Sequence, residues 1–372
     1  MKKTNISALL LAALLLIQLL CAPVFAVTAE PAADAQADAQ TASDNSAEDA
    51  AAEADSVPED QLLSSREQFS VAAKAALLID LNTNRVVYEQ DADERVYPAS
   101  LTKIMTCLIA LENGNLSDVV TVSESALADL DEDSSVAGLV VGEQMTLENL
   151  LYCMMVVSGN DACNVIAEHV AGSVTDFVRM MNQRAYELGC TNTHFNNPHG
   201  LHDESHYTTA RDLAIITQAA LKSENFRQIV DTYEYKLPDD NMRQNIPKLK
   251  TTNMLIYQSM SNSLYYPRAH GIKTGYTSQA GRCVISEATG DGLDLLGIVC
   301  GAATTVLDSG DLLMENFTEC ARLFDYGFDN YSYLTLMSPL YPVDQVKINN
   351  SAGAEAVAVA PEDEIKVLLP ND

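Results

Sequence analysis

Residues 97–108 read YPASLTKIMTCL and place a serine at the start of an apolar segment, with a lysine three residues further on. The apolar residues recur at helical spacing and predict a helix from Ser100 that ends at Asn113-Gly114. Side chains three residues apart lie on one helical face, so Lys103 can reach the Ser100 hydroxyl. Two interpretations follow: Ser100 is an N-cap beside a solvated lysine, or Ser100 is a nucleophile whose proton Lys103 removes.

The bulk composition limits the class of protein. With 372 residues, the chain can form one large domain with appendages, or two domains. The formal net charge of −30 argues against nucleic acid or an anionic membrane surface as the main partner. A small anionic ligand stays possible, because the local field of a site can differ from the net charge.

The N-terminal residues have the pattern of an export signal. Lys2 and Lys3 precede an apolar run at 6–20, and Val24-Phe25-Ala26 supplies small residues for cleavage after Ala26. We therefore expect a signal peptide at 1–26 and an exported protein that acts in the cell envelope. Residues 27–63 contain no basic residue and almost no large apolar one, which predicts a disordered acidic linker over 27–66.

The cysteines do not indicate a disulfide framework. Removal of the segment that contains Cys21 leaves seven of the eight cysteines, an odd number scattered over a large domain without a CxxC pair. Most have apolar neighbours, so we expect small buried hydrophobic side chains rather than disulfides or a zinc site.

Strand patterns flank a helical middle. The runs AALLIDL and RVVYEQ, joined by a polar Asn-Thr-Asn turn, predict a β-hairpin at 75–81 and 85–90. Helices are expected near 147–157, 161–170, 174–188 and 210–221. Three strands (270–277, 281–289, 293–302) and a final helix near 308–325 follow. This order predicts an α+β fold, with a catalytic domain over 67–330 and a short, curtailed β-rich piece at 331–372.

Three polar clusters carry the chemistry. The first is Ser100-x-x-Lys103, the second is Ser158-Gly159-Asn160 between two predicted helices, and the third is Lys273-Thr274-Gly275 within a strand. Each cluster alone also has a structural reading as a cap, a turn or an edge-strand charge. In this order, however, they resemble the S-x-x-K, S-x-N and K-T-G signatures of the penicillin-recognising serine enzymes.

Within that superfamily the chain resembles the serine D-alanyl-D-alanine carboxypeptidases, the low-molecular-mass penicillin-binding proteins, over roughly residues 67–330. The segments that carry the resemblance are YPASLTKIMT (97–106), VVSGNDA (156–162), FNNPHGLHDESHYTTARDLA (195–214) and GIKTGYTSQAG (271–281). It implies a β-lactamase/DD-peptidase-like fold, an antiparallel sheet with flanking helices and a mainly helical subdomain. A class A β-lactamase would have aspartate where this chain has Gly159.

The resemblance also implies roles for individual residues. Ser100 would attack the bond between two terminal D-alanines of a peptidoglycan stem peptide, with Lys103 as its general base. Ser158 would relay a proton to the leaving amine, and Asn160 would orient Lys103 and the substrate. β-Lactam antibiotics would act as covalent inhibitors, and no metal or organic cofactor is implied.

Substrate binding is assigned in the same way to the third cluster. Lys273 and Thr274 would receive the terminal carboxylate, and Gly275 would leave room for the substrate to align along the strand. The backbone N–H groups of Ser100 and Tyr276 would form the oxyanion hole.

Other readings stay open at this point. A metal site is possible at His199, His202 and His206, with Asp203 and Glu204 between them, although the loop lacks a helical HExxH pair. A β-lactamase, a transpeptidase or a catalytically silent wall-binding protein would carry the same motifs. The curtailed C-terminal piece leaves membrane attachment undecided.

Overall fold

The computed structural model describes residues 69–128, 130, 134–306, 312–347 and 356–371. The expected signal peptide and acidic linker, including Cys21, lie outside these residues. Within them, the seven remaining cysteines are all buried, as predicted, and their thiols are free.

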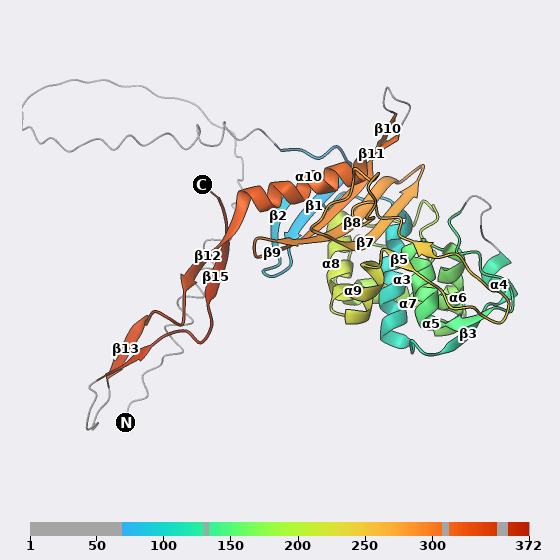
Figure 1. Cartoon of the computed structure of the whole chain (residues 1–372), viewed down its shortest axis with the longest axis horizontal. Helices are drawn as coiled ribbons and strands as arrows, with labels where there is room; N and C mark the ends of the chain where they lie inside the picture. The colour runs from blue at the N-terminus through green and yellow to red at the C-terminus, as the bar shows by residue number, and fades with distance from the viewer. Residues whose placement is uncertain (1–68, 129, 131–133, 307–311, 348–355, 372) are drawn as a thin grey trace, which may run out of the picture. The chain divides into compact units, whose positions relative to one another are not determined.

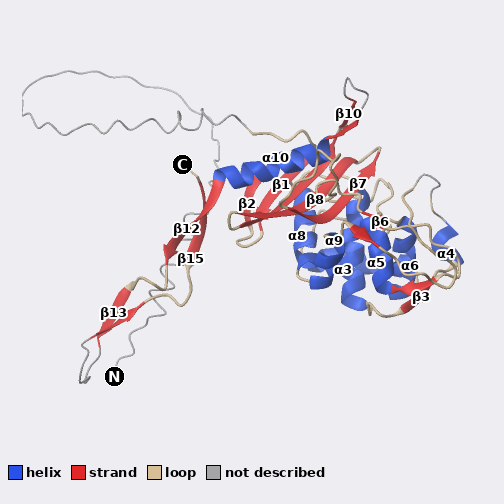
Figure 2. Cartoon of the chain, viewed as in Figure 1, coloured by secondary structure: helices blue, strands red, loops and turns tan. Residues whose placement is uncertain are grey.

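A five-stranded antiparallel sheet organises the described core (Figures 1 and 2). Its strand order is β2-β1-β9-β8-β7, and every neighbouring pair is antiparallel. The strands are β1 (Ala75–Asp80), β2 (Arg85–Gln90), β7 (Ala269–Thr277), β8 (Gly281–Gly290) and β9 (Leu293–Ala302). The predicted hairpin and the three later strands are therefore confirmed, and so is the α+β fold. In this sheet β7, with the Lys-Thr-Gly motif, is an edge strand.

The central strands are apolar because both faces of the sheet are covered. All six residues of β1 are buried. Alternate side chains point to opposite faces, so Leu77 joins one hydrophobic core and Leu78 the other. The larger core lies under the helical subdomain, and the smaller one lies under α10 (Glu315–Asn330).

The helical subdomain contains all four helices predicted for the middle of the chain. Its main helices are α3 (Lys103–Asn113), α5 (Leu147–Val156), α6 (Asn160–Ala171), α7 (Val174–Glu187), α8 (Ala210–Leu221) and α9 (Glu224–Val230), which was not predicted. Side chains of Thr146, Ser173 and Thr209 cap α5, α7 and α8 by accepting a backbone N–H, which gives these helices definite starts.

Shorter elements complete the subdomain. They are η1 (Ala99–Thr102), β3 (Val119–Thr121), α4 (Glu124–Ala128), β4 (Gln144–Thr146), β5 (Glu234–Tyr235) and β6 (Leu249–Lys250). β3 pairs with β4 and β5 with β6, each antiparallel.

The last helix begins later than its sequence predicted. Residues Leu312–Met314 form β11, which pairs with β10 (Thr304–Val306), and α10 starts at Glu315. The predicted start at 308 was wrong because the apolar residues before Glu315 are used in strand pairing. α10 packs closely on β9, where a Cβ on Gly297 would lie 2.9 Å from the Phe324 ring.

The C-terminal piece consists of two-stranded pairs. β12 (Tyr331–Met337) pairs with β15 (Ile365–Pro370), and β13 (Asp344–Lys347) pairs with β14 (Ala356–Val359). Leu368 is buried in the smaller core, so this piece contacts the catalytic fold. Within the described part of the chain, no helix combines the length and apolar character that a membrane span requires.

Truncation of Phe324 tests the smaller core. Phe324 is fully buried, so Phe324→Ala should lower the free energy of unfolding by about 3–5 kcal/mol through lost burial and a cavity. Chemical denaturation measures this change. The matched control, Tyr186→Ala, removes an aromatic ring that is 77% exposed and should change stability by less than about 0.5 kcal/mol. Equal effects of the two substitutions would contradict this assignment of the core.

Candidate active site

Ser100 lies in a short helical turn that precedes α3. Residues Ala99–Thr102 form a 3-10 turn, and the regular helix begins at Lys103. Pro98 and Thr102 occupy the two N-cap positions, and neither caps with its side chain. The N-cap interpretation of Ser100 is therefore wrong. Its hydroxyl is instead within 2.8 Å of the Lys103 amine.

Lys103 is completely buried, and its amine has three oxygen partners. Nζ lies 2.8 Å from Ser100 Oγ, 2.7 Å from Asn160 Oδ1 and 2.8 Å from the carbonyl oxygen of His199. Burial lowers the pKa of Lys103, because a desolvated ammonium is unfavourable. A neutral amine has two hydrogens and one lone pair. The Asn160 and His199 oxygens can only accept, so they take both hydrogens and leave the lone pair facing the Ser100 hydroxyl.

The Ser158-Gly159-Asn160 cluster lies at the junction of α5 and α6. Ser158 has a positive φ of 63°, and Asn160 is the first residue of α6. A Cβ on Gly159 would lie 2.7 Å from Asp161 Oδ1 and 3.1 Å from the Cys153 carbonyl oxygen. This crowding requires glycine at the position where a class A β-lactamase has aspartate.

The third cluster brings the sheet edge against the Ser100 turn, Ala99–Thr102. Lys273 is buried, and its amine donates to the Thr274 carbonyl at 3.0 Å. Burial, and then the charge of Lys103, lower the pKa of Lys273 well below its ordinary value. A Cβ on Gly275 would lie 3.0 Å from the Pro98 carbonyl oxygen and 3.1 Å from the Ser100 nitrogen. Glycine at 275 thus allows β7 to pass directly beside Ser100.

These three clusters surround one cleft of about 480 Å³. Six of the eight residues expected at the site line it, namely Ser100, Ser158, Asn160, Thr274, Gly275 and Tyr276. The two lysines are buried beneath its surface. Sequence reasoning missed Ser135, Thr252, Arg282 and Phe317, which also line the cleft and carry no motif of their own.

The histidine loop, residues 199–206, supports the Ser100 turn. A Cβ on Gly200 would overlap the Ala99 carbonyl oxygen at 1.8 Å. His206 Nδ1 accepts the Asn196 N–H and its Nε2 pairs with Thr102 Oγ1 at 2.9 Å, which occupies both ring nitrogens. Within the described ranges, no three His, Cys, Asp or Glu side chains are grouped so that they could hold a metal ion.

A serine hydroxyl on a helical turn, a buried lysine within hydrogen-bond distance and an adjacent sheet edge define an active-site serine hydrolase of the penicillin-recognising fold. The chain belongs to the D-alanyl-D-alanine carboxypeptidase family, whose model matches residues 62–304.

Individual relatives agree with this family. D-alanyl-D-alanine carboxypeptidase DacF of Bacillus subtilis is 37% identical over 284 residues, which cover 74% of this chain and 67% of DacF. DacA of Haemophilus influenzae is 35% identical over 70% of this chain and 63% of its own length. Among solved structures, the Streptomyces K15 DD-transpeptidase matches 70% of this chain and 98% of its own, with a TM-score of 0.62 and 30% identity. This chain therefore spans about two thirds of the length of DacF and of DacA from Haemophilus influenzae.

Acidification should destabilise the fold through the histidine loop. Burial lowers the pKa of His206 from 6.5 to about 4, so the unfolded chain binds the proton more readily and stability falls as the pH drops from 6.5 to 4. This effect amounts to about 3 kcal/mol. In His206→Gln, the free energy of unfolding should fall less between pH 6.5 and 4 than in wild type, because the His206 contribution is gone. Denaturation curves recorded at several pH values in this range measure the difference. The prediction is wrong if both proteins lose stability equally.

Proposed function

We propose that this protein is a serine D-alanyl-D-alanine carboxypeptidase that removes the terminal D-alanine from peptidoglycan stem peptides through an acyl-enzyme on Ser100. The observation that carries the proposal is the hydrogen bond between the buried Lys103 amine and the Ser100 hydroxyl. Membership of the carboxypeptidase family supports the choice of substrate.

In the acylation step, Ser100 Oγ attacks the carbonyl carbon between the two D-alanines and Lys103 takes the hydroxyl proton. The lone-pair direction set by Asn160 and His199 favours this transfer. The N–H groups of Ser100 and Tyr276 stabilise the oxyanion, a contribution of roughly 3–4 kcal/mol for each donor. Ser158, which lines the cleft, passes a proton to the leaving amine. Water then hydrolyses the acyl-enzyme, with Lys103 again as the base.

Substrate binding uses the free edge of the sheet. In the described sheet β7 pairs with β8 alone, so an extended peptide can add as a further strand beside Thr274 and Gly275. The terminal carboxylate then lies at the Thr274 hydroxyl. Its negative charge favours the protonated form of the buried Lys273 and offsets part of the desolvation cost. β-Lactams enter the same cleft and acylate Ser100.

The cellular setting is part of the proposal. The signal-like residues 1–26 support export to the cell envelope, where peptidoglycan lies. Residues 67–330 then form the catalytic domain, which overlaps the family match at 62–304, and residues 331–372 form the β-rich C-terminal piece.

Release of D-alanine from a synthetic peptide ending in D-Ala-D-Ala tests the proposal directly. Wild type should release D-alanine, and Ser100→Ala should reduce kcat by more than about a thousandfold. The same peptide with a C-terminal amide is the matched control and should be a poor substrate, because it lacks the carboxylate. A folded wild type that releases no D-alanine would refute the carboxypeptidase activity.

Added acceptors separate the related reactions. Transfer of the acyl group to an added amine, in preference to water, would identify a transpeptidase. Rapid turnover of penicillin without D-alanine release would identify a β-lactamase, and stable acylation without any turnover would identify a binding protein.

The pH dependence of acylation tests the role of Lys103. Because the neutral amine is the base, the rate of acylation by a fluorescent penicillin should fall as the pH drops through the lowered pKa of Lys103. Lys103→Arg should abolish acylation at every pH, since a guanidinium cannot be deprotonated in a protein. Measurable acylation by Lys103→Arg would exclude Lys103 as the base.

A further inference from the structure

Residues 134–143, here called the wall segment, connect the active site to a buried polar cluster. Ser135 lines the cleft, and its carbonyl oxygen accepts the Asn160 N–H at 2.8 Å. The Asp161 carboxylate accepts the N–H groups of Ala137 at 2.9 Å and Leu139 at 3.0 Å. The position of the wall segment is therefore coupled to Asn160, one of the three partners of Lys103.

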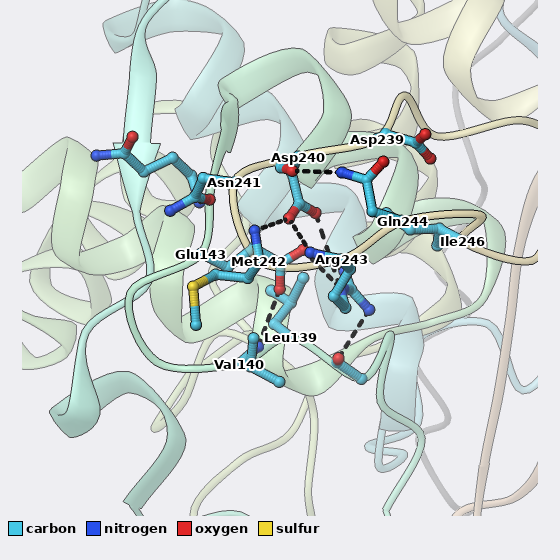
Figure 3. Close-up of polar contacts among 12 residues, drawn as sticks. Leu139, Val140, Glu143, Asp239, Asp240, Asn241, Met242, Arg243, Gln244 and Ile246 are labelled. Carbon is cyan, nitrogen blue, oxygen red and sulfur yellow. Dashed lines mark hydrogen bonds and ion pairs between the residues drawn. The ribbon is translucent and has the colours of Figure 1, made fainter.

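The other side of the wall segment is held by the loop that contains residues 239–244 (Figure 3). Arg243 donates to the Gly138 carbonyl oxygen at 2.8 Å and, through Nε, to Glu143 Oε1 at 2.8 Å. Glu143 Oε2 in turn accepts the Val140 N–H at 2.9 Å. A single guanidinium thus joins both halves of the wall segment to the loop.

Two carboxyl groups meet at this guanidinium. The side chain of Glu143 is 0% exposed and that of Asp240 is 5% exposed. Asp240 Oδ1 accepts the N–H groups of Met242 and Arg243, both at 2.7 Å, whereas the buried Oδ2 has no hydrogen-bond donor and lies 3.8 Å from Arg243 Nε. Two ionised carboxylates here would leave an uncompensated buried charge. A proton on Glu143 removes that charge and supplies the donor that Oδ2 lacks.

The electrostatic environment places the proton on Glu143. Burial is the largest cause that raises the pKa of Glu143, and the neighbouring Asp240 carboxyl raises it further. The pKa of Asp240 is lowered: burial acts to raise it, and the nearby Glu143 carboxyl and the two backbone N–H groups outweigh that effect. Other ionisable groups nearby include Asp239, Asp161 across the wall segment, and the Cys153 thiol, whose pKa is raised by burial.

We propose that Glu143 and Asp240 share one proton, and that this pair and Arg243, together called the clasp, position the wall segment against Asn160 and Asp161. Loss of the shared proton at alkaline pH leaves two adjacent carboxylates for one guanidinium. Their repulsion loosens the contacts at Gly138 and Val140 and, through Ser135, the support of Asn160. The kinetic part of this inference rests on the proposed function, with Glu143, Asp240 and Arg243 as positioning residues.

Hydrogen exchange tests the clasp independently of activity. Glu143→Gln keeps an N–H for Asp240 and an oxygen for Arg243 at every pH, and it loses the acceptor for the Val140 N–H. In wild type, protection of amides in the 134–143 peptide should fall about tenfold per pH unit above the titration of the pair, after correction for intrinsic exchange. In Glu143→Gln, protection should start lower because the Val140 contact is lost, and it should not change with pH. Asp240→Asn, which also removes the shared proton, is a second variant in case Glu143→Gln does not fold.

The matched control is Glu287→Gln. Glu287 is another buried carboxylate paired with an arginine, Arg227, at 2.8 Å, and it lies outside the active-site cleft. This variant should keep the wild-type pH dependence of exchange at 134–143. Identical exchange profiles for wild type and the two clasp variants would overturn the proposal.

Kinetics then connects the clasp to the reaction. With a fluorescent penicillin, wild type and Glu287→Gln should lose acylation rate at alkaline pH together with protection, whereas Glu143→Gln should not. Arg243→Gln should lower the acylation rate about tenfold at all pH values, because the tie to Gly138 is lost. An effect of Arg243→Gln on thermal unfolding alone would overturn the positioning role. A wild type without acylation or D-alanine release, but with the predicted exchange pattern, would refute the proposed function and support the clasp.

Discussion

Burial of the Lys103 amine is the constraint on which the rest of the site depends. A lysine with no exposed surface needs partners for its hydrogens, and the fold supplies them from α6 and from the histidine loop, through Asn160 and His199. Those two acceptors direct the lone pair toward Ser100. Packing thus sets both properties of the lysine, because the dry environment that lowers its pKa also fixes its orientation beside Ser100.

Close backbone contacts make this burial possible. Gly200 lets the histidine loop lie against the Ser100 turn, and Gly275 lets β7 lie against the same turn. Gly159 fits between Asp161 and the Cys153 carbonyl oxygen. At each position a Cβ would separate two backbones that the site needs in contact. The same packing makes the wall segment part of the site, since Asp161 holds that segment and follows Asn160 directly.

Local patterns predicted much of the fold and failed where pairing is non-local. The hairpin, four middle helices and three later strands followed from periodicity and turn residues that a short window contains. The start of α10 was misplaced, because whether Leu312–Met314 is helix or strand depends on its partner, Thr304–Val306. Ser135, Thr252 and Arg282 were missed at the cleft because the chain path, and no motif, brings them there.

By itself the sequence determined the family, the α+β layers and the three motifs that meet at the cleft, because these depend on short motifs and their order. The tertiary structure alone decided that Ser100 is not a cap, that both lysines are buried and that the Lys103 amine contacts the oxygens of Asn160 and His199. It also brought Glu143 and Asp240 to one guanidinium. These properties depend on desolvation and on contacts between distant segments, and neither is encoded within any single stretch of the chain.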